Sequence, residues 1–263
     1  MILPLGHGTS ALMTQLSVNV NKLATLRNSR GKNTPNLLEF SEKILTLGVF
    51  GLTVHPRPDG RHIRKNDVLE LKELIQRWQK KSLNIEFNIE GYPSEDFMQL
   101  IEAVKPEQCT LVPDPPEALT SNAGWDLVKN FKQLYEVTHR LGRTSRVSLF
   151  VEPSQFSKEQ AEALKNINPH RIELYTEAYA DAFGHNNCQE VLESYKATAM
   201  VAKDLGIGVN AGHDLNQENL GLLIKTIPWI AEVSIGHALF CESLEQGLST
   251  TIRRYQAILA SPL

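Results

Sequence analysis

Two glycine-histidine pairs lie near the carboxyl end of the chain, Gly212-His213 and Gly236-His237. Each pair follows a short apolar run, 207–211 or 232–235, and a segment with helical periodicity lies between them. Such runs bounded by glycine are typical of buried strands. A neutral imidazole can accept or deliver a proton near pH 7. The pattern therefore predicts proton-transfer chemistry where two parallel strands end, which is where α/β proteins place their active sites.

Most of the other predicted strands also end in a residue that could do chemistry. In chain order the strand ends supply Asn19, His55, Glu86, Glu152, Glu173 with Thr176, Asn210 with His213, and Gly236 with His237. Barrel strand interiors are expected to be branched and apolar, so polar residues recurring at one end predict a catalytic rim.

Two carboxylates lie among apolar neighbours, Glu86 in LNIEFNIE and Glu173 in HRIELYTE. A buried carboxylate is costly unless it is paired, and burial raises its pKa toward the range useful for acid/base catalysis. We favour a functional role for both. The alternative is a structural salt bridge inside the barrel, with Arg57 or Lys22 as the partner.

Eight short β-rich runs alternate with amphipathic segments along the chain. The runs cover 15–19, 50–55, 83–87, 108–112, 146–151, 171–175, 207–211 and 232–235. The amphipathic segments cover 37–47, 67–80, 94–104, 126–141, 158–166, 189–205, 219–227 and 242–259. One strand-helix unit cannot bury both faces of its strand, so we predict an α/β fold with a single (β/α)8 TIM barrel domain over 15–263. An open doubly wound sheet is the alternative, and residues 1–14 are predicted to form a loose N-terminal extension.

The composition excludes several classes of partner. The chain of 263 residues carries a net charge of -3, so no basic excess predicts nucleic-acid binding. No apolar run approaches the roughly 20 residues that a membrane span needs. Cys109, Cys188 and Cys241 form no CxxC pair, which favours free thiols in a reducing compartment. The opening residues make a poor signal peptide, so we expect a cytoplasmic protein.

Glycines and basic loops predict phosphate binding at the same rim. NAGHD and SIGHA stand where the last two strands end, and glycine there lets backbone N–H groups approach an anion. Two loops add cations, LATLRNSRGKNTP with Arg30 and the preceding Lys22, and HPRPDGRHIR with Arg57 and His62. The alternatives are glycines that only turn the chain and a solvated basic surface.

These residues match a known family, because the chain resembles pyridoxine 5'-phosphate synthases. The strings that carry the resemblance are SVNVNKLATLRNSRG, LTVHPRPDGRHI, LNIE, LVPDPPEALTS, RIELYTEAYA, VNAGHDL and VSIGHAL. The resemblance implies a (β/α)8 barrel with additional helices that assembles as a homo-octamer built from dimers. It also implies condensation of 1-deoxy-D-xylulose 5-phosphate with 3-amino-2-oxopropyl phosphate, releasing phosphate and water, with no metal and no organic cofactor.

The resemblance also assigns roles to individual residues. It implies that His55 and Glu86 accept protons, that His213 donates one, and that Glu173 stabilises charge in the transition state. The residues implied to hold the amino-ketone phosphate are Asn19, Arg30, Asp214, Gly236 and His237. Those implied to face the deoxyxylulose phosphate are Asn21, Lys22, Arg57, His62 and Thr120.

The chain departs from the family pattern at two places. The better-known members have Asp-His where this chain has Asn21-Lys22, so Asn21 cannot accept a proton as an aspartate would. The familiar His-Thr-Gly after the sixth strand is replaced by Tyr175-Thr176-Glu177. We interpret both changes as a variant site that performs the same reaction.

Two other functions compete with this interpretation. A metal-dependent hydrolase or isomerase would use His55, Glu86, Glu173 and His213 as ligands, although no HxH or HExxH pair supports a metal site. A barrel that binds phosphate without catalysis is the second alternative, and Asn21-Lys22 is its only support.

Overall fold

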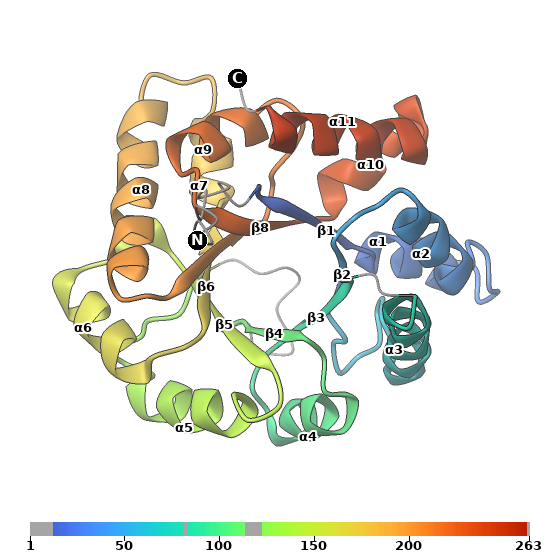
Figure 1. The fold of residues 1–263 in the computed structure, drawn as a ribbon, viewed down its shortest axis with the longest axis horizontal. Helices are drawn as coiled ribbons and strands as arrows, with labels where there is room; N and C mark the ends of the chain where they lie inside the picture. The colour runs from blue at the N-terminus through green and yellow to red at the C-terminus, as the bar shows by residue number, and fades with distance from the viewer. Residues whose placement is uncertain (1–12, 82–83, 114–122, 262–263) are drawn as a thin grey trace, which may run out of the picture.

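Eight parallel strands close into a barrel in the order of the sequence (Figure 1). The computed structural model describes residues 13–81, 84–113 and 123–261. The strands are β1 (Gln15–Asn19), β2 (Gly51–Val54), β3 (Glu86–Gly91), β4 (Gln108–Leu111), β5 (Arg146–Val151), β6 (Arg171–Tyr175), β7 (Gly208–Gly212) and β8 (Ile230–Ile235). The predicted (β/α)8 barrel is confirmed, and the doubly wound sheet is excluded because β1 pairs with both β2 and β8.

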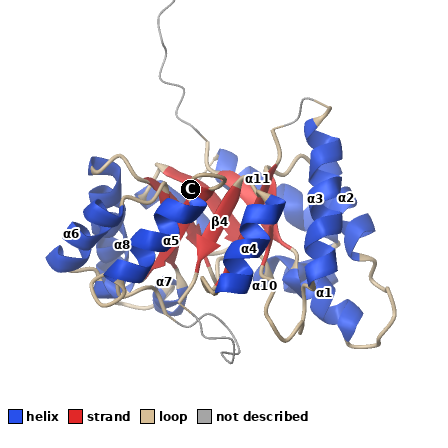
Figure 2. Ribbon diagram, turned by 90° about the horizontal axis from the view of Figure 1, so that it is seen from below, coloured by secondary structure: helices blue, strands red, loops and turns tan. Residues whose placement is uncertain are grey.

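Helices surround the barrel and cover the outer faces of the strands (Figures 1 and 2). They are α1 (Asn21–Asn28), α2 (Leu37–Thr46), α3 (Lys65–Gln79), α4 (Glu95–Val104), α5 (Phe131–Leu141), the short 3-10 helix η1 (Pro153–Gln155), α6 (Lys158–Ile167), α7 (Glu177–Ala182), α8 (Cys188–Asp204), α9 (Leu220–Thr226), α10 (His237–Gln246) and α11 (Leu248–Ala260). Among the described residues, no helix combines the length and the apolar character that crossing a membrane requires.

Three helices, α1, η1 and α7, fall outside the predicted amphipathic segments. The sequence suggested a basic loop over α1 and a polar strand end over α7, because both helices are too short to show a helical period clearly. The predicted segment 242–259 divides into α10 and α11 at Gly247, whose φ of 78° ends one helix and starts the next.

The start of β3 corrects one prediction. Glu86 pairs with Gly51, the first residue of β2, so Glu86 begins β3 and does not end it. The predicted run 83–87 was therefore misplaced. The sequence N-I-E occurs twice, at 84–86 and 88–90, and the structure uses the second copy to end the strand. Glu90 thus takes the rim position that the sequence had assigned to Glu86.

The inside of the barrel is polar, contrary to the expectation of branched apolar residues. Near its amino end lies an ion-paired layer, which we call the amino-end layer, made of Glu86, Gln108, Arg146, Arg171, Asn210 and Glu232. Gln108 accepts a hydrogen bond from Asn210 at 3.2 Å across the lumen, since β4 and β7 are not neighbours. The apolar core lies instead between the strands and the helices.

The described part of the predicted extension is ordered against the barrel. Thr14 is buried, and its hydroxyl donates to the carbonyl oxygen of Ile230 at 2.8 Å. Residues 1–12 lie outside the described residues.

Candidate active site

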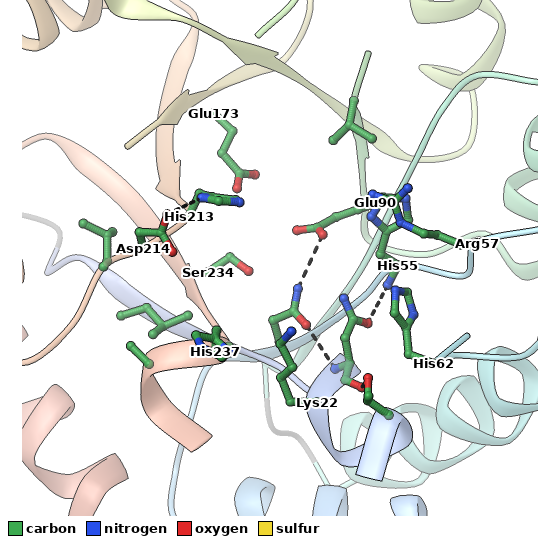
Figure 3. Close-up of a pocket in the computed structure, with 18 of the residues that line it drawn as sticks. Lys22, His55, Arg57, His62, Glu90, Glu173, His213, Asp214, Ser234 and His237 are labelled. Atoms are coloured by element: carbon green, nitrogen blue, oxygen red, sulfur yellow. Dashed lines mark hydrogen bonds and ion pairs between the residues drawn. The ribbon is translucent and has the colours of Figure 1, made fainter. Parts of the chain in front are cut away.

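A cavity of about 520 Å³ opens at the carboxyl ends of the strands. It brings together residues from β1, β3, β5, β6 and β8 and from the segments that follow β1, β2, β4, β7 and β8 (Figure 3). The predicted site residues that line it are Asn19, Asn21, Lys22, His55, Arg57, His62, Glu173, His213, Asp214, Gly236 and His237. The geometric prediction of one shared rim is therefore confirmed for these residues.

Three predicted site residues do not line this cavity as described. Glu86 lies at the opposite end of the barrel in an ion pair with Arg146, so its predicted place at the rim is wrong. The alternative of a structural salt bridge is correct in kind, although the partner is neither Arg57 nor Lys22. Arg30 is exposed beyond the end of α1 and does not line the cavity. Thr120 lies outside the described residues.

Glu90 is the main site residue that the sequence interpretation missed. It lines the cavity, and its Oε2 accepts a hydrogen bond from Asn19 Nδ2 at 3.4 Å. Figure 3 shows the Glu90 carboxylate between the histidines of the β2 side and Glu173. The repeated N-I-E was the available signal, because a strand that begins at the first glutamate must end near the second.

The β1–β2 side of the cavity positions His55. Asn21, the first residue of α1, accepts a hydrogen bond from the backbone N–H of His55 at 2.9 Å. Asn19 in turn accepts from the backbone N–H of Asn21 at 3.1 Å. Burial, followed by electrostatic interactions with Arg57, His62 and Arg61, lowers the pKa of His55 well below its usual value. His55 is therefore neutral at pH 7 in the absence of a ligand.

His62 is held as a neutral hydrogen-bond donor. The backbone N–H of Ile63 donates to His62 Nδ1 at 2.9 Å, which leaves the ring proton on Nε2. Burial is the main reason that the pKa of His62 falls to about 4, and Arg57 adds to the effect. The rings of His62 and His55 lie 6.1 Å apart between centroids.

The β6–β7 side holds His213 and Glu173. His213 Nδ1 lies 2.8 Å from Asp214 Oδ2, and this hydrogen bond is the main reason that the pKa of Asp214 is lowered. Glu173 is buried on β6 and accepts a hydrogen bond from the hydroxyl of Thr110 at 3.3 Å. Burial raises the pKa of Glu173 to about 8, and the charge of Glu232 acts in the same direction.

Gly212 leaves the space that the Glu173 carboxylate occupies. A Cβ at position 212 would lie 2.3 Å from Glu173 Oε1, a distance that two such atoms cannot share. Gly212 is therefore needed to make room for the Glu173 carboxylate, in addition to any role in the turn that follows β7.

Two regions of the cavity suit anions. The first is the amino end of α10, where Gly236 is the N-cap and no side chain caps the first N–H groups. A Cβ at Gly236 would lie 3.0 Å from the carbonyl oxygen of Asn19, so only glycine lets β8 and β1 approach there without a shift. The second region is the β1–β2 side, where Lys22, Arg57 and Arg61 line the cavity.

Comparison with known proteins identifies the family. The sequence model described as "Pyridoxal phosphate biosynthesis protein PdxJ" matches residues 16–261. The chain belongs to this family. It is 48% identical over 250 residues to the pyridoxine 5'-phosphate synthase of Parabacteroides distasonis, covering 95% of this chain and 100% of the relative. It is 47% identical over 244 residues to that of Cytophaga hutchinsonii, covering 92% and 98%.

Solved structures support the fold alone. A 3-keto-L-gulonate-6-phosphate decarboxylase from Vibrio cholerae superposes with a TM-score of 0.60 at 8% identity, covering 95% of this chain and 99% of that one. A tryptophan synthase alpha-subunit from Pyrococcus furiosus also gives 0.60, at 13% identity and with 94% and 98% covered.

In this PdxJ family chain, Asn21 and Lys22 have different contacts. Asn21 accepts a hydrogen bond from the His55 backbone, whereas Lys22 presents a cation to the cavity. An amide oxygen accepts the His55 N–H as a carboxylate oxygen would, so Asn21 can hold the end of β2 without contributing a charge.

The described residues show no metal centre. No group of three His, Cys, Asp or Glu side chains among them could hold a metal ion. The four ligands of the alternative hydrolase or isomerase do not converge, since Glu86 lies at the far end of the barrel.

Proposed function

We propose that this chain is a pyridoxine 5'-phosphate synthase. It condenses 1-deoxy-D-xylulose 5-phosphate with 3-amino-2-oxopropyl phosphate and forms pyridoxine 5'-phosphate, inorganic phosphate and water, which makes it a transferase of pyridoxine biosynthesis. The observation that carries the proposal is the cavity that joins His55, Glu90, Glu173 and His213 between two anion-binding regions. The name shared by the relatives of Parabacteroides and Cytophaga supports it.

The reaction needs several proton transfers, and the cavity holds groups in different protonation states. His55 is neutral and acts as a proton acceptor. Glu90 replaces Glu86 as the second acceptor, because it is the glutamate of β3 that lines the cavity. His213 donates a proton, and Glu173 interacts with charge that develops between the two histidine sides. One base could not serve Schiff-base formation, phosphate elimination and ring closure together.

We assign the phosphate group of one substrate to each of the two anion-binding regions. The amino end of α10, with Gly236 and His237, receives the phosphate of the amino ketone. Lys22, Arg57 and His62 on the β1–β2 side receive the deoxyxylulose phosphate, because arginine and lysine bind phosphate oxygens strongly. In this proposal the reacting carbons lie between His55 and His213.

The Asn21-Lys22 and Tyr175-Thr176-Glu177 positions form a variant of the family site with the same reaction. Asn21 keeps the backbone contact to His55, and Tyr175 packs its ring against His213 with 4.8 Å between centroids. Assembly as a homo-octamer built from dimers and location in the cytoplasm stay predictions from the resemblance. Light scattering of the purified protein tests the first of these.

The test of function is a coupled assay with both substrates. Pyridoxine 5'-phosphate is followed by its absorbance, and phosphate release is measured in parallel. We expect one phosphate per pyridoxine 5'-phosphate, and neither product when one substrate is omitted. Folded protein that binds both substrates but forms no product would support the non-catalytic barrel instead.

A further inference from the structure

The loop after β7 holds a histidine and an aspartate in a backbone conformation that favours glycine. His213 has a φ of 84° and Asp214 a φ of 57°. Residues with side chains adopt this left-handed region rarely, and aspartate tolerates it better than most. When two consecutive residues with side chains are held there, the surrounding structure must impose it, and such positions concentrate at functional sites.

Neighbouring elements hold this loop from both sides. The Thr176 hydroxyl lies 2.9 Å from the carbonyl oxygen of Gly212 and also contacts that of His213. On the other side Asn219 Nδ2 donates to the carbonyl oxygen of Asp214 at 3.1 Å. Thr176 and Asn219 are both buried, so the backbone under the two side chains is fixed.

The fixed backbone directs the Asp214 carboxylate onto the His213 ring. Nδ1 and Oδ2 are 2.8 Å apart, the length of a charge-assisted hydrogen bond, and Figure 3 shows the pair at the wall of the cavity. The edge-on ring of Tyr175, at 69° to the imidazole, restricts its rotation. Because Nδ1 carries the proton shared with Asp214, Nε2 is the nitrogen available to a substrate.

The side chain of Asp214 does not suit the phosphate-binding role that the resemblance implied for this residue. A carboxylate has no hydrogen to donate when ionised, and it repels a phosphate. Its hydrogen bond is directed to His213 rather than to the amino end of α10. The Asp214 carboxylate therefore interacts with the His213 ring rather than with a phosphate.

We propose that Asp214 is a positioning residue for His213, which keeps the imidazole proton on Nδ1 and stabilises the imidazolium that donates from Nε2. The inference rests on the proposed function for the identity of the proton acceptor, which is a substrate intermediate. It does not depend on that function for the hydrogen bond itself. A carboxylate behind a catalytic imidazole acts in this way in serine hydrolases.

Several other charged or titratable groups face the pair and stay unchanged in the test. Glu173 and Tyr175 face it from β6, and the Tyr175 hydroxyl donates to Glu177 at 2.5 Å. His237 from α10 and Lys22 from α1 act on Asp214. A change that appears only when Asp214 is replaced is therefore assigned to the Asp214–His213 contact.

The experiment compares Asp214→Asn and Asp214→Gly with the wild type. Asn keeps the shape and tolerates the left-handed backbone, while Gly removes the side chain and any strain. Asp204→Asn is the matched control, because Asp204 is exposed at the end of α8, at the opposite end of β7. For each protein we measure kcat and KM against pH, and the titration and tautomer of the His213 ring by nitrogen-15 NMR.

We expect both variants to lower kcat by roughly 10- to 100-fold, which is less than the loss for a buried triad aspartate because this pair is partly exposed. KM for the two substrates should change by less than about threefold, since the lost interaction is not with the ground state. The His213 ring should lose its preference for the proton on Nδ1.

Two outcomes would overturn the inference. An unchanged His213 titration and tautomer in Asp214→Asn would show that the carboxylate does not act on the ring. A rise in KM for one substrate at constant kcat would make Asp214 a binding residue. If the wild type formed no pyridoxine 5'-phosphate, the proposed function would fail, and the NMR titration would still decide the Asp214–His213 contact.

Discussion

The two ends of the barrel carry the same kinds of charged residue in different surroundings. At the amino end, Arg146 pairs with Glu86, and Arg171 pairs with Glu232 at 2.9 Å. At the carboxyl end, Glu173 accepts a hydrogen bond from a threonine hydroxyl and faces a cavity together with Glu90 and four histidines. One end closes the barrel with paired charges, while the other presents titratable groups to a ligand.

The comparison shows that partners and location, rather than residue type, separate structural acids from reactive ones. Burial raises the pKa of Glu232 to about 7 even beside Arg171, and it also raises the pKa of Glu173. Only Glu173 lies where a substrate can reach it. A perturbed pKa alone would not have distinguished the two ends.

The largest expected effect is the loss of kcat when His213, at the carboxyl end of the barrel, is replaced. His213→Asn should lower kcat by about 10²- to 10⁴-fold with little change in KM, because a general acid is lost. His170→Asn is the control, since His170 lies before β6 at the amino end and its Nδ1 accepts from the backbone of Val147. We expect its kcat to stay within about twofold. Steady-state kinetics on both variants measure this, and a change confined to KM in His213→Asn would remove the assigned role.

The two glutamates of β3 test the same contrast on one strand. Glu90→Gln should lower kcat by roughly 10²-fold because it removes an acid/base group from the cavity. Glu86→Gln should keep kcat for the folded protein but lose about 1–3 kcal/mol of unfolding free energy, because Arg146 loses its anionic partner. Kinetics and urea denaturation measure the two effects. The reverse pattern would restore the catalytic role that the sequence first assigned to Glu86.

Two glycines of β7 sharpen the comparison. In Gly212→Ala the new methyl would displace the Glu173 carboxylate, so we expect kcat to fall by about tenfold or more. Gly208→Ala is the matched change at the amino end, where the new Cβ would meet Arg171 Cγ at 3.0 Å. The Arg171 side chain can move, so kcat should stay within about twofold while stability falls. Equal losses of kcat in both variants would argue against the placement of Glu173.

The smallest expected effect is a pH dependence of stability. Glu173 has a pKa of about 8 in the folded protein, above that of an unfolded glutamate. Its stabilising protonated form is fully present below about pH 4.5 and is lost as the pH rises through about 8. Glu173→Gln should therefore gain about 1 kcal/mol or more relative to the wild type between pH 5 and pH 8.

Denaturation curves at several pH values measure this gain. Glu190→Gln, at an exposed position on α8, should show no trend with pH. Glu232→Gln should show a smaller gain of the same sign as the pH rises through about 7, because burial also raises the pKa of Glu232. A flat difference for Glu173→Gln would mean that the Glu173 carboxyl is ionised in the folded protein at neutral pH.

The sequence predicted the barrel and most of its rim, because strand periodicity and polar strand ends are local features. His55, His213 and Gly236 were placed by their position after apolar runs, and Glu173 by its position among apolar neighbours. Glu90 was missed because N-I-E repeats within one strand, and the choice between Glu86 and Glu90 depends on pairing with β2. The amino-end layer was missed because its contacts cross the lumen between strands distant in sequence. The contact of Asp214 with His213 depends on two positive φ values that no residue pattern encodes.

The most direct test of the central claim is a crystal structure of His213→Asn soaked with both substrates, since slowed turnover would let them be seen together. We predict one phosphate at the amino end of α10 beside Gly236 and the other beside Lys22 and Arg57, with the carbon chains between His55 and position 213. Substrates bound away from the carboxyl end of the barrel, or outside the cavity that contains Glu90 and Glu173, would contradict the account.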